Sequence, residues 1–348
     1  MKNKSMEVSF MKRVWSLVLV IALVMMSLVG CSAPAESAPA DQPAGNAEPV
    51  TIKLAHVVNE QDGFHIAALK FKELVEERTD GQYLVEIYPN ATLGDERTLL
   101  EGMQMGTVDM GVITNGPVAN FVEEIAVFEL PFLFGSPEEA YQILDGEIGQ
   151  ELLDKLENAN LKGLAFAERG FRNLTNSQKT VMTPADIDGL KIRVMENPVY
   201  LDTFKALGAN AVPMAWTEAL TALQQGTIDG QENPVGVIYT FKLYETQKYL
   251  SLTRHTYAPA TIVMSNKLYQ ELPEDVQGIF KTAALEAAQF ERQSNADSEE
   301  EQLEALKANG MEVVKPNVKA FKAEIMDVYD KYGEKFGDYI DRILAELE

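Results

Sequence analysis

Hydrophobic and polar positions alternate with two different periods along the chain from residue 50 onward. Residues 50–57 and 83–90 mix β-branched residues with alternating polar ones, which predicts two strands, and residues 108–114 read as a buried strand. Residues 66–81 and 96–106 instead repeat apolar positions at helical spacing, and each segment ends at a glycine. This β-α-β-α-β order predicts an α/β fold with a largely parallel sheet covered by helices.

A six-residue phrase recurs later in the chain. Residues 104–109 read QMGTVD and residues 224–229 read QQGTID, and each follows a leucine-containing helical stretch. In both copies the glycine, Gly106 or Gly226, is expected to end its helix in the left-handed conformation before a strand begins. The repeat favours two α/β lobes over one continuous sheet, although unrelated helix-to-strand turns often use similar residues and could also produce it.

The last third of the chain is predicted to be helical. Residues 273–310 are rich in Ala, Glu, Gln and Leu, with Gly278 as the one internal glycine. This composition predicts one long helix, or two, bracing both lobes. Residues 321–348 form a further charged amphipathic stretch.

The first thirty residues have the organisation of a secretory signal. A Lys-Arg pair precedes an apolar run at residues 14–29, and Gly30 and Cys31 follow. The run is short for the roughly 20 apolar residues of a transmembrane helix, so a permanent span is the weaker interpretation. Residues 28–31 resemble the bacterial lipobox, which predicts lipidation of Cys31; the alternative is a chance cysteine behind an ordinary signal. The Ala/Pro-rich residues 31–49 that follow suit a flexible tether.

Composition and charge narrow the range of partners. With 348 residues, 46% apolar and 24% charged, the chain is long enough for two domains and has a globular composition. Its net charge of −23 becomes −26 once the predicted signal is removed. Such an acidic chain argues against nucleic acid as a partner, but it is compatible with a small anion in a local basic pocket. The single cysteine excludes an internal disulfide and a thiolate metal cluster.

Motifs of catalysis and of cofactor binding are absent from the sequence. It contains no Gly-x-Ser-x-Gly, no His-Glu-x-x-His, no phosphate-binding loop and no Gly-x-Gly-x-x-Gly after a strand. The three histidines, His56, His65 and His255, are not at metal-ligand spacing. The sequence therefore predicts a protein that is not an enzyme and that holds neither a metal nor a cofactor.

One arginine in the middle of the chain is a candidate for ligand binding. Arg193 lies in an apolar strand, residues 190–195, where an arginine is costly unless it is paired. Lys191 shares its face, and both lie toward the carboxyl end of the strand, where open α/β sheets bind ligands. A guanidinium can hold a carboxylate through two parallel hydrogen bonds. From the pattern alone, a structural ion pair is an equally good interpretation.

The blocks around this arginine resemble a known family. Residues 170–178 (GFRNLTNSQ), 186–198 (DIDGLKIRVMENP) and 230–234 (GQENP) are similar to the substrate-binding proteins of tripartite ATP-independent periplasmic (TRAP) transporters. The similarity extends over residues 50–348. It implies two periplasmic-binding-protein-like α/β lobes, joined by hinge strands and a long helix, that close on a ligand. It also implies that Arg193 forms the selectivity salt bridge with the substrate carboxylate.

The resemblance further implies a set of ligand contacts around that salt bridge. The implied contacts are Arg193, Arg172, Asn233 and Trp216, together with Glu96, Thr114, Asn115 and His56 from the first lobe. Arg172 would be a second cation, Asn233 an amide partner of the carboxylate, and Trp216 the aromatic wall of the cleft. Glu96 could instead serve a structural ion pair, and His56 could be an ordinary satisfied histidine.

The resemblance also bears on the ligand. The sialic-acid-binding branch carries a further arginine where this chain has Asn115-Gly116-Pro117, which argues against sialic acid. Residues 167–176 and 195–204 look more like members that take uronic or aldonic sugar acids. A C4-dicarboxylate or another small acid is the alternative ligand, and a membrane-anchored secreted enzyme is the alternative class.

The expected organisation follows from these segments. It comprises a signal at 1–30, a tether at 31–49, lobe I at 50–169 with about 259–298, and lobe II at 170–258 with about 299–348. The resemblance implies a small carboxylate ligand and a membrane permease with a small and a large subunit as partners. The expected form is a monomer outside the cytoplasm, held to the membrane by a lipid on Cys31.

Overall fold

The computed structural model of the chain describes residues 48–348. The predicted signal at residues 1–30, Cys31 and nearly all of the predicted tether lie outside the described residues and stay predictions. Between residues 48 and 348, no helix is long and apolar enough to cross a membrane.

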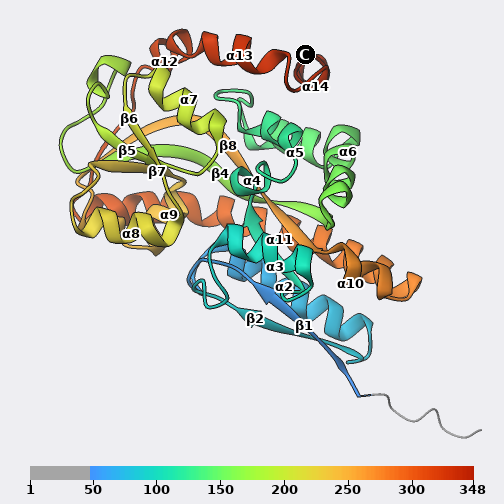
Figure 1. Ribbon diagram of the computed structural model, residues 1–348. Coiled ribbons are helices and arrows are strands. Elements are labelled where there is room, and N and C mark those ends of the chain that lie inside the picture. Colours follow the sequence, from blue (N-terminus) through green and yellow to red (C-terminus); the bar gives the residue numbers. More distant parts are fainter. Residues whose placement is uncertain (1–47) are drawn as a thin grey trace, which may run out of the picture. The chain divides into compact units, whose positions relative to one another are not determined.

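Nine strands form a single hydrogen-bonded sheet in the order β2-β1-β3-β8-β4-β7-β5-β6, with β9 beside β8 (Figure 1). The strands are β1 Val50–Ala55, β2 Tyr83–Tyr88, β3 Met110–Thr114, β4 Leu161–Asn176, β5 Lys191–Val194, β6 Asn210–Pro213, β7 Gly230–Asn233, β8 Tyr249–Ser265 and β9 Glu312–Val314. Strands β1, β2 and β3 are mutually parallel, and so are β5, β6 and β7. The predicted α/β fold and its β-α-β-α-β beginning are confirmed.

Helices connect and cover the strands. They are α2 Gly63–Arg78, α3 Glu96–Met105, α4 Asn115–Val118, α5 Pro137–Leu144, α6 Glu147–Lys155, α7 Pro198–Ala206, α8 Trp216–Gln224, α9 Val235–Thr240, α10 Asn266–Glu271, α11 Glu274–Ala308, α12 Val318–Glu324, α13 Met326–Gly333 and α14 Tyr339–Leu347. Asp62 and Asp95 begin α2 and α3 by accepting a backbone N–H in the first turn. The charged stretch predicted at 321–348 is divided among the last three helices.

The two glycines of the repeated phrase have the expected conformation. Gly106 ends α3 with a φ of 74°, and Gly226 follows α8 with a φ of 63°. This left-handed backbone is open to glycine at little cost, and it turns the chain from each helix into the next strand. The phrase therefore marks equivalent turns before β3 and β7.

Two long strands join the halves of the sheet. Strands β4 and β8 contain 16 and 17 residues and pair antiparallel along their length, while β4 also pairs with β7 and β8 with β3. The two lobes therefore share one sheet, which corrects the expectation of two separate ones. The boundaries predicted after residues 169 and 258 fall at opposed positions inside these strands, where Glu168 faces Pro259 and Gly170 faces Ala258.

Helix α11 is one continuous element of 35 residues, which decides between the predicted one helix and two. It packs on α2 in one half, on β4 between the halves and on α9 in the other (Figure 1). Its buried face includes Ala283, Ala284, Ala287 and Ala288. Because these side chains are small, the helix can lie close to the strands that join the lobes.

Candidate functional site

Arg193 lies near the carboxyl end of β5, at the edge where β6 and β7 also end. It stands opposite Val212 in β6 and Gln231 in β7. Its Nε and Nη2 donate to the backbone oxygen of Met214 at 3.0 and 2.7 Å, and its guanidinium lies 5.6 Å from the centre of the Trp216 ring. The strand and the loop before α8 thus hold the guanidinium in one orientation.

Arg193 is buried without an ion-pair partner. It is 3% exposed, and no carboxylate oxygen of residues 48–348 lies within 4.0 Å of it, although each other buried arginine has such a partner. Those pairs are Arg172–Glu232, Arg169–Asp62 and Arg292–Asp145. Burial lowers the pKa of Arg193 from 12.5 to about 10, so the side chain is charged at neutral pH. An unpaired buried cation is costly, which indicates that an external anion completes it.

A cavity of about 50 Å³ opens beside this cation. Its wall includes Val57, Glu96, Asn120, Arg193 and Trp216. The first three belong to the predicted lobe I and the last two to lobe II. The cavity therefore lies between the lobes, at the carboxyl ends of β1 and β5. We call it the cleft cavity.

Two asparagines connect the lobes near this cavity. Asn120 Nδ2 donates to the backbone oxygen of Glu196 at 2.7 Å, and Asn197 Nδ2 donates to that of Gly116 at 3.0 Å. Both bonds join the segment after β3 to the segment after β5. The described structure thus has its lobes in contact across the cleft.

Arg172 lies behind the site in a buried ion pair. Its Nη2 donates to the backbone oxygen and to Oε1 of Glu232 at 2.6 and 2.8 Å, and its Nε donates to Oε2. Burial would lower the pKa of Arg172, but the Glu232 charge raises it above its ordinary value. Glu232 takes the Nε–Nη2 edge of the guanidinium, so the geometry shows Arg172 as a charged support near Arg193; a direct ligand contact stays a prediction.

Glu96 reaches the cleft cavity from the start of α3. Its Oε1 accepts the backbone N–H of Thr114 at 2.7 Å. Burial raises the pKa of Glu96, and hydrogen bonds from the backbone and the side chain of Thr114, with the charges of Arg169 and Arg193, oppose the rise. Glu96 forms no ion pair among the described residues and lines the cleft cavity. Thr114 therefore orients the Glu96 carboxylate through its backbone N–H and its side chain.

Asn115 points away from the cleft cavity toward a buried carboxyl group. Its Nδ2 donates to Oε1 of Glu129 at 3.0 Å, and the hydroxyl of Tyr200 donates to Oε2 at 2.5 Å. Burial raises the pKa of Glu129 to about 7, against these hydrogen bonds. Asn115 therefore organises a contact between the lobes in this structure, and its predicted role as a ligand contact stays untested.

Glu129 is expected to make stability depend on pH. Its folded-state pKa of about 7 lies above the ordinary 4.5, so the folded state holds the proton more tightly and loses stability as pH rises from about 4.5 through 7. Glu129→Gln should remove this loss. In urea titrations, the free energy of unfolding of the variant relative to that of the wild type should rise by at most about 3 kcal/mol between pH 5 and 8. A difference that is constant with pH would contradict this assignment.

His56 ends β1 and is fully buried. Its Nε2 lies 3.1 Å from Nδ1 of His65, and its Nδ1 has no partner among the described residues. Burial, with the charges of His65 and Arg169, lowers the pKa of His56 to about 3, so the ring is neutral. Its neighbour Val57, and not His56, lines the cleft cavity. A contact between His56 and a ligand hydroxyl stays a prediction.

Asn233 and Trp216 are the predicted contacts from the second lobe. Asn233 Nδ2 donates to Oε1 of Gln231 at 2.6 Å, and Asn233 does not line the cleft cavity, so its contact with a ligand stays a prediction. Trp216 lines the cleft cavity, packs edge-on against Phe241, and buries its indole N–H without an acceptor in residues 48–348. The indole N–H is thus a second unpaired donor beside the cation.

Three features of the cavity were not among the predicted contacts. Asn120 bridges the lobes, Met214 orients Arg193 through its carbonyl, and Val57 lines the wall. Met214 acts through its backbone carbonyl, which every residue carries, so its residue type gives no signal in the sequence. Val57 could have been found, because it follows the strand-end position already assigned to His56.

A two-lobed fold with an unpaired cation between its lobes is typical of a receptor for a small anion. Residues 54–335 match the family described as bacterial extracellular solute-binding protein, family 7 (DctP), and the chain belongs to this family. The family is periplasmic, and its members are the solute receptors of TRAP transporters.

Several relatives are named for a sugar acid or were solved with one, and the C4-dicarboxylate-binding periplasmic protein DctP of Rhodobacter capsulatus is 33% identical over 298 residues, which cover 84% of this chain and 89% of that protein. The chain is 36% identical over 264 residues to the 2,3-diketo-L-gulonate-binding periplasmic protein YiaO of Escherichia coli, covering 76% of this chain and 80% of that protein. A TRAP periplasmic solute-binding protein from Polaromonas, bound to D-erythronate, is 38% identical with a TM-score of 0.83. The match covers 85% of this chain and 97% of that chain. The sugar acid binding protein DctPAm from Advenella mimigardefordensis, in complex with galactonate, is 34% identical with a TM-score of 0.83. The match covers 86% of this chain and 97% of that chain.

Proposed function

We propose that this TRAP receptor binds a uronic or aldonic sugar acid through an ion pair between Arg193 and the ligand carboxylate. The observation that carries the proposal is the burial of Arg193 without any carboxylate from residues 48–348. Its Nε and Nη2 are held by Met214, and Nη1 donates to no acceptor in this part of the chain. A ligand carboxylate at Nη1 would supply the missing charge and an acceptor.

Sugar hydroxyls fit the remaining polar groups of the cleft. Glu96 offers a carboxylate oxygen and Trp216 an indole N–H, and the family resemblance adds the amide of Asn233. A C4-dicarboxylate, the alternative ligand, would need a second free cation. Two other buried cations of strand β4, Arg172 and Arg169, are already paired within the described chain. The charge balance therefore favours one carboxylate and several hydroxyls.

The receptor would act by closure and delivery rather than by catalysis. A ligand held between the lobes stabilises their contact, and a membrane permease of one small and one large subunit would recognise the closed form. We place the protein outside the cytoplasm as a monomer anchored by a lipid on Cys31. Turnover of a bound acid would instead favour a secreted enzyme, the remote alternative.

A thermal-shift screen tests the ligand class. D-glucuronate, D-galactonate and D-erythronate should raise the melting temperature, because a ligand that binds the native state alone stabilises it. At a hundredfold excess over Kd the gain is about 2.7 kcal/mol. Trp216 is the one tryptophan of residues 48–348 and lines the cleft cavity, so its emission should change in the same titrations.

The screen also distinguishes the alternatives. Succinate and malate should give a much smaller shift than the sugar acids. A larger shift with these dicarboxylates would replace the proposed ligand by the alternative. If no acid moves either the melting temperature or the emission of Trp216, the proposed ligand class is wrong.

A further inference from the structure

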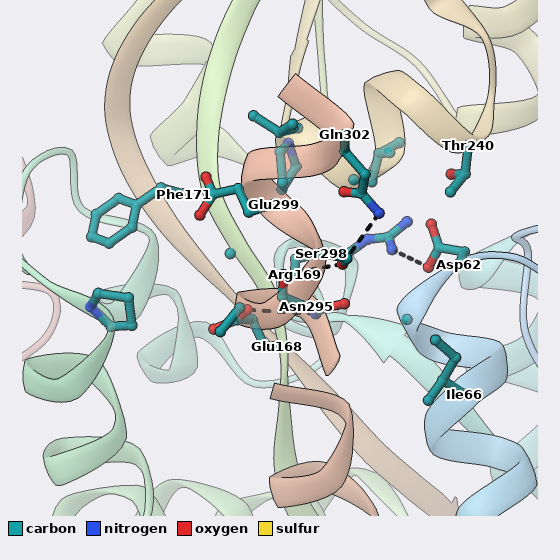
Figure 2. Close-up of a pocket in the computed structure, with 18 of the residues that line it drawn as sticks. Asp62, Ile66, Glu168, Arg169, Phe171, Thr240, Asn295, Ser298, Glu299 and Gln302 are labelled. Carbon is teal, nitrogen blue, oxygen red and sulfur yellow. Dashed lines mark hydrogen bonds and ion pairs between the residues drawn. The ribbon is translucent and has the colours of Figure 1, made fainter. Parts of the chain in front are cut away.

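A second and larger cavity lies on the other side of the junction between the lobes. Its volume is about 310 Å³, and it shares no lining residue with the cleft cavity. The start of α2, the strands β4 and β8, the helix α9 and the middle of α11 form its walls (Figure 2). We call it the hinge-side cavity. A molecule bound there would contact both lobes and the helix that spans them.

One cation of this cavity has no partner. The guanidinium of Arg254, from β8, makes no hydrogen bond and no ion pair within residues 48–348, and it lies 3.8 Å from the centre of the Phe171 ring. Partial burial lowers the pKa of Arg254, although the charges of Glu299 and Glu168 oppose this. The stacked guanidinium therefore presents its N–H groups to the cavity without an acceptor.

The other charges of the wall are neutralised or peripheral. Arg169 donates to Oδ1 of Asp62 at 2.6 Å (Figure 2). Glu168 accepts the hydroxyls of Tyr141 and Tyr257 at 2.5 and 3.0 Å, and burial raises its pKa. Neither group forms an ion pair with Arg254 within the described residues. The exposed Glu299 is the remaining carboxylate of the lining, and it lies beyond ion-pair distance.

The backbone fixes Arg254 in an uncommon conformation. Its φ of 43° lies in the left-handed region, which non-glycine residues adopt rarely. The backbone N–H donates to Oδ1 of Asn173 at 3.2 Å, and β4 is irregular between Arg172 and Leu174 on the opposite strand. Strain of this kind is concentrated at functional sites, and here it directs a free guanidinium into a cavity.

Neutral polar groups surround the rest of the space. The hydroxyl of Thr240 is buried and has no partner in the described chain. Gln302 and Ser298 reach in from α11, where the amide of Gln302 donates to the hydroxyl of Ser298 at 3.3 Å (Figure 2). Gln61 lines the side that belongs to α2. Such a wall suits a molecule with hydroxyl groups around one negative charge.

We propose that the hinge-side cavity is a second binding site, which takes a small hydroxy acid with its carboxylate on Arg254 and its hydroxyls toward Thr240 and Gln302. This site is separate from the ion pair proposed at Arg193. Because its walls come from both lobes, its ligand would contact the same two lobes as the ligand of the cleft.

Equilibrium dialysis of the purified protein with ¹⁴C-labelled D-gluconate, D-glucuronate and L-lactate tests this site. We expect two equivalents of at least one acid per wild-type chain, and one equivalent each for Arg193→Ala and Arg254→Asn. Asparagine tolerates the left-handed backbone, so Arg254→Asn removes the guanidinium without new strain. Thr240→Val, which keeps the side-chain shape, should weaken the second equivalent by about fivefold. Arg78→Gln, at an exposed ion pair outside both cavities, is the matched control.

The outcomes separate this proposal from the proposed function. One equivalent in the wild type, lost in Arg193→Ala and kept in Arg254→Asn, overturns the second site and leaves the receptor function intact. One equivalent that is kept in Arg193→Ala and lost in Arg254→Asn overturns the assignment of Arg193 instead. Failure of all three acids to give a second equivalent overturns the second site for hydroxy acids.

Discussion

Replacing Arg193 by methionine should abolish sugar-acid binding and leave the ligand-free protein at least as stable as the wild type. Without the guanidinium, a bound carboxylate would be buried with no counter-charge, which costs about 2–5 kcal/mol. The expected loss of affinity is therefore about 30-fold to several thousand-fold. Isothermal titration with the best ligand of the screen measures it directly.

The stability of the same variant follows from the pKa of Arg193. A fall from 12.5 to about 10 means that burial of the charged form costs the folded protein about 3 kcal/mol below pH 10. Methionine removes this cost but leaves the carbonyl of Met214 without its donors, a loss of about 1–3 kcal/mol. Unfolding in urea should thus show a change between zero and a gain of about 2 kcal/mol. A variant that does not fold would contradict this expected stability. A variant that binds the sugar acid as tightly as the control Arg78→Gln would contradict the assignment of Arg193 as the partner of the ligand carboxylate.

Local signals in the sequence determine much of the first half of the fold. The strands predicted at 50–57 and 83–90 are observed at 50–55 and 83–88 because alternation and β-branching act within each segment. Gly106 ends its helix as expected because its backbone conformation requires little from distant residues. Such features depend on near neighbours, so a single sequence can report them.

The junction between the lobes could not be predicted in the same way. Strand β4 carries Glu168, Arg169 and Arg172, which interrupt the apolar pattern of a buried strand. Their burial is tolerated because partners arrive from distant segments: Glu232 lies 60 residues from Arg172, and Asp62 lies 107 residues from Arg169. No local pattern encodes these pairings, so the continuity of the sheet was missed.

The same reasoning separates what was predictable at the site. An arginine in an apolar strand marked Arg193 as either a ligand clamp or an ion pair. Tertiary packing distinguishes the two, because it brings a carboxylate within ion-pair distance of Arg172, whereas no carboxylate of the described chain lies within 4.0 Å of Arg193. Net charge was a poor guide, since an acidic protein still presents an unpaired cation in its cleft.

Arg172→Met should have the largest effect on stability. Arg172 is 1% exposed and Glu232 is fully buried. Removing the guanidinium therefore leaves the Glu232 carboxylate buried without its counter-charge, with only backbone groups and His255 beside it. Breaking a buried pair from one side costs about 3–5 kcal/mol. The loss should be greatest above the raised pKa that Glu232 acquires once its partner is gone, and it should shrink as acid protonates the carboxyl group.

Joint replacement distinguishes this cost from a packing defect. In Arg172→Met/Glu232→Leu neither charge is left buried alone, and apolar side chains of similar volume often replace a buried ion pair without loss. The double variant should therefore recover most of the 3–5 kcal/mol lost by Arg172→Met in urea unfolding. It should also bind the sugar acid, because Arg193 keeps its hydrogen bonds to Met214. If the two substitutions instead add their separate losses, the Arg172–Glu232 pair acts through shape and not through charge. If stability recovers but binding is lost, Arg172 contacts the ligand, as the family resemblance implies.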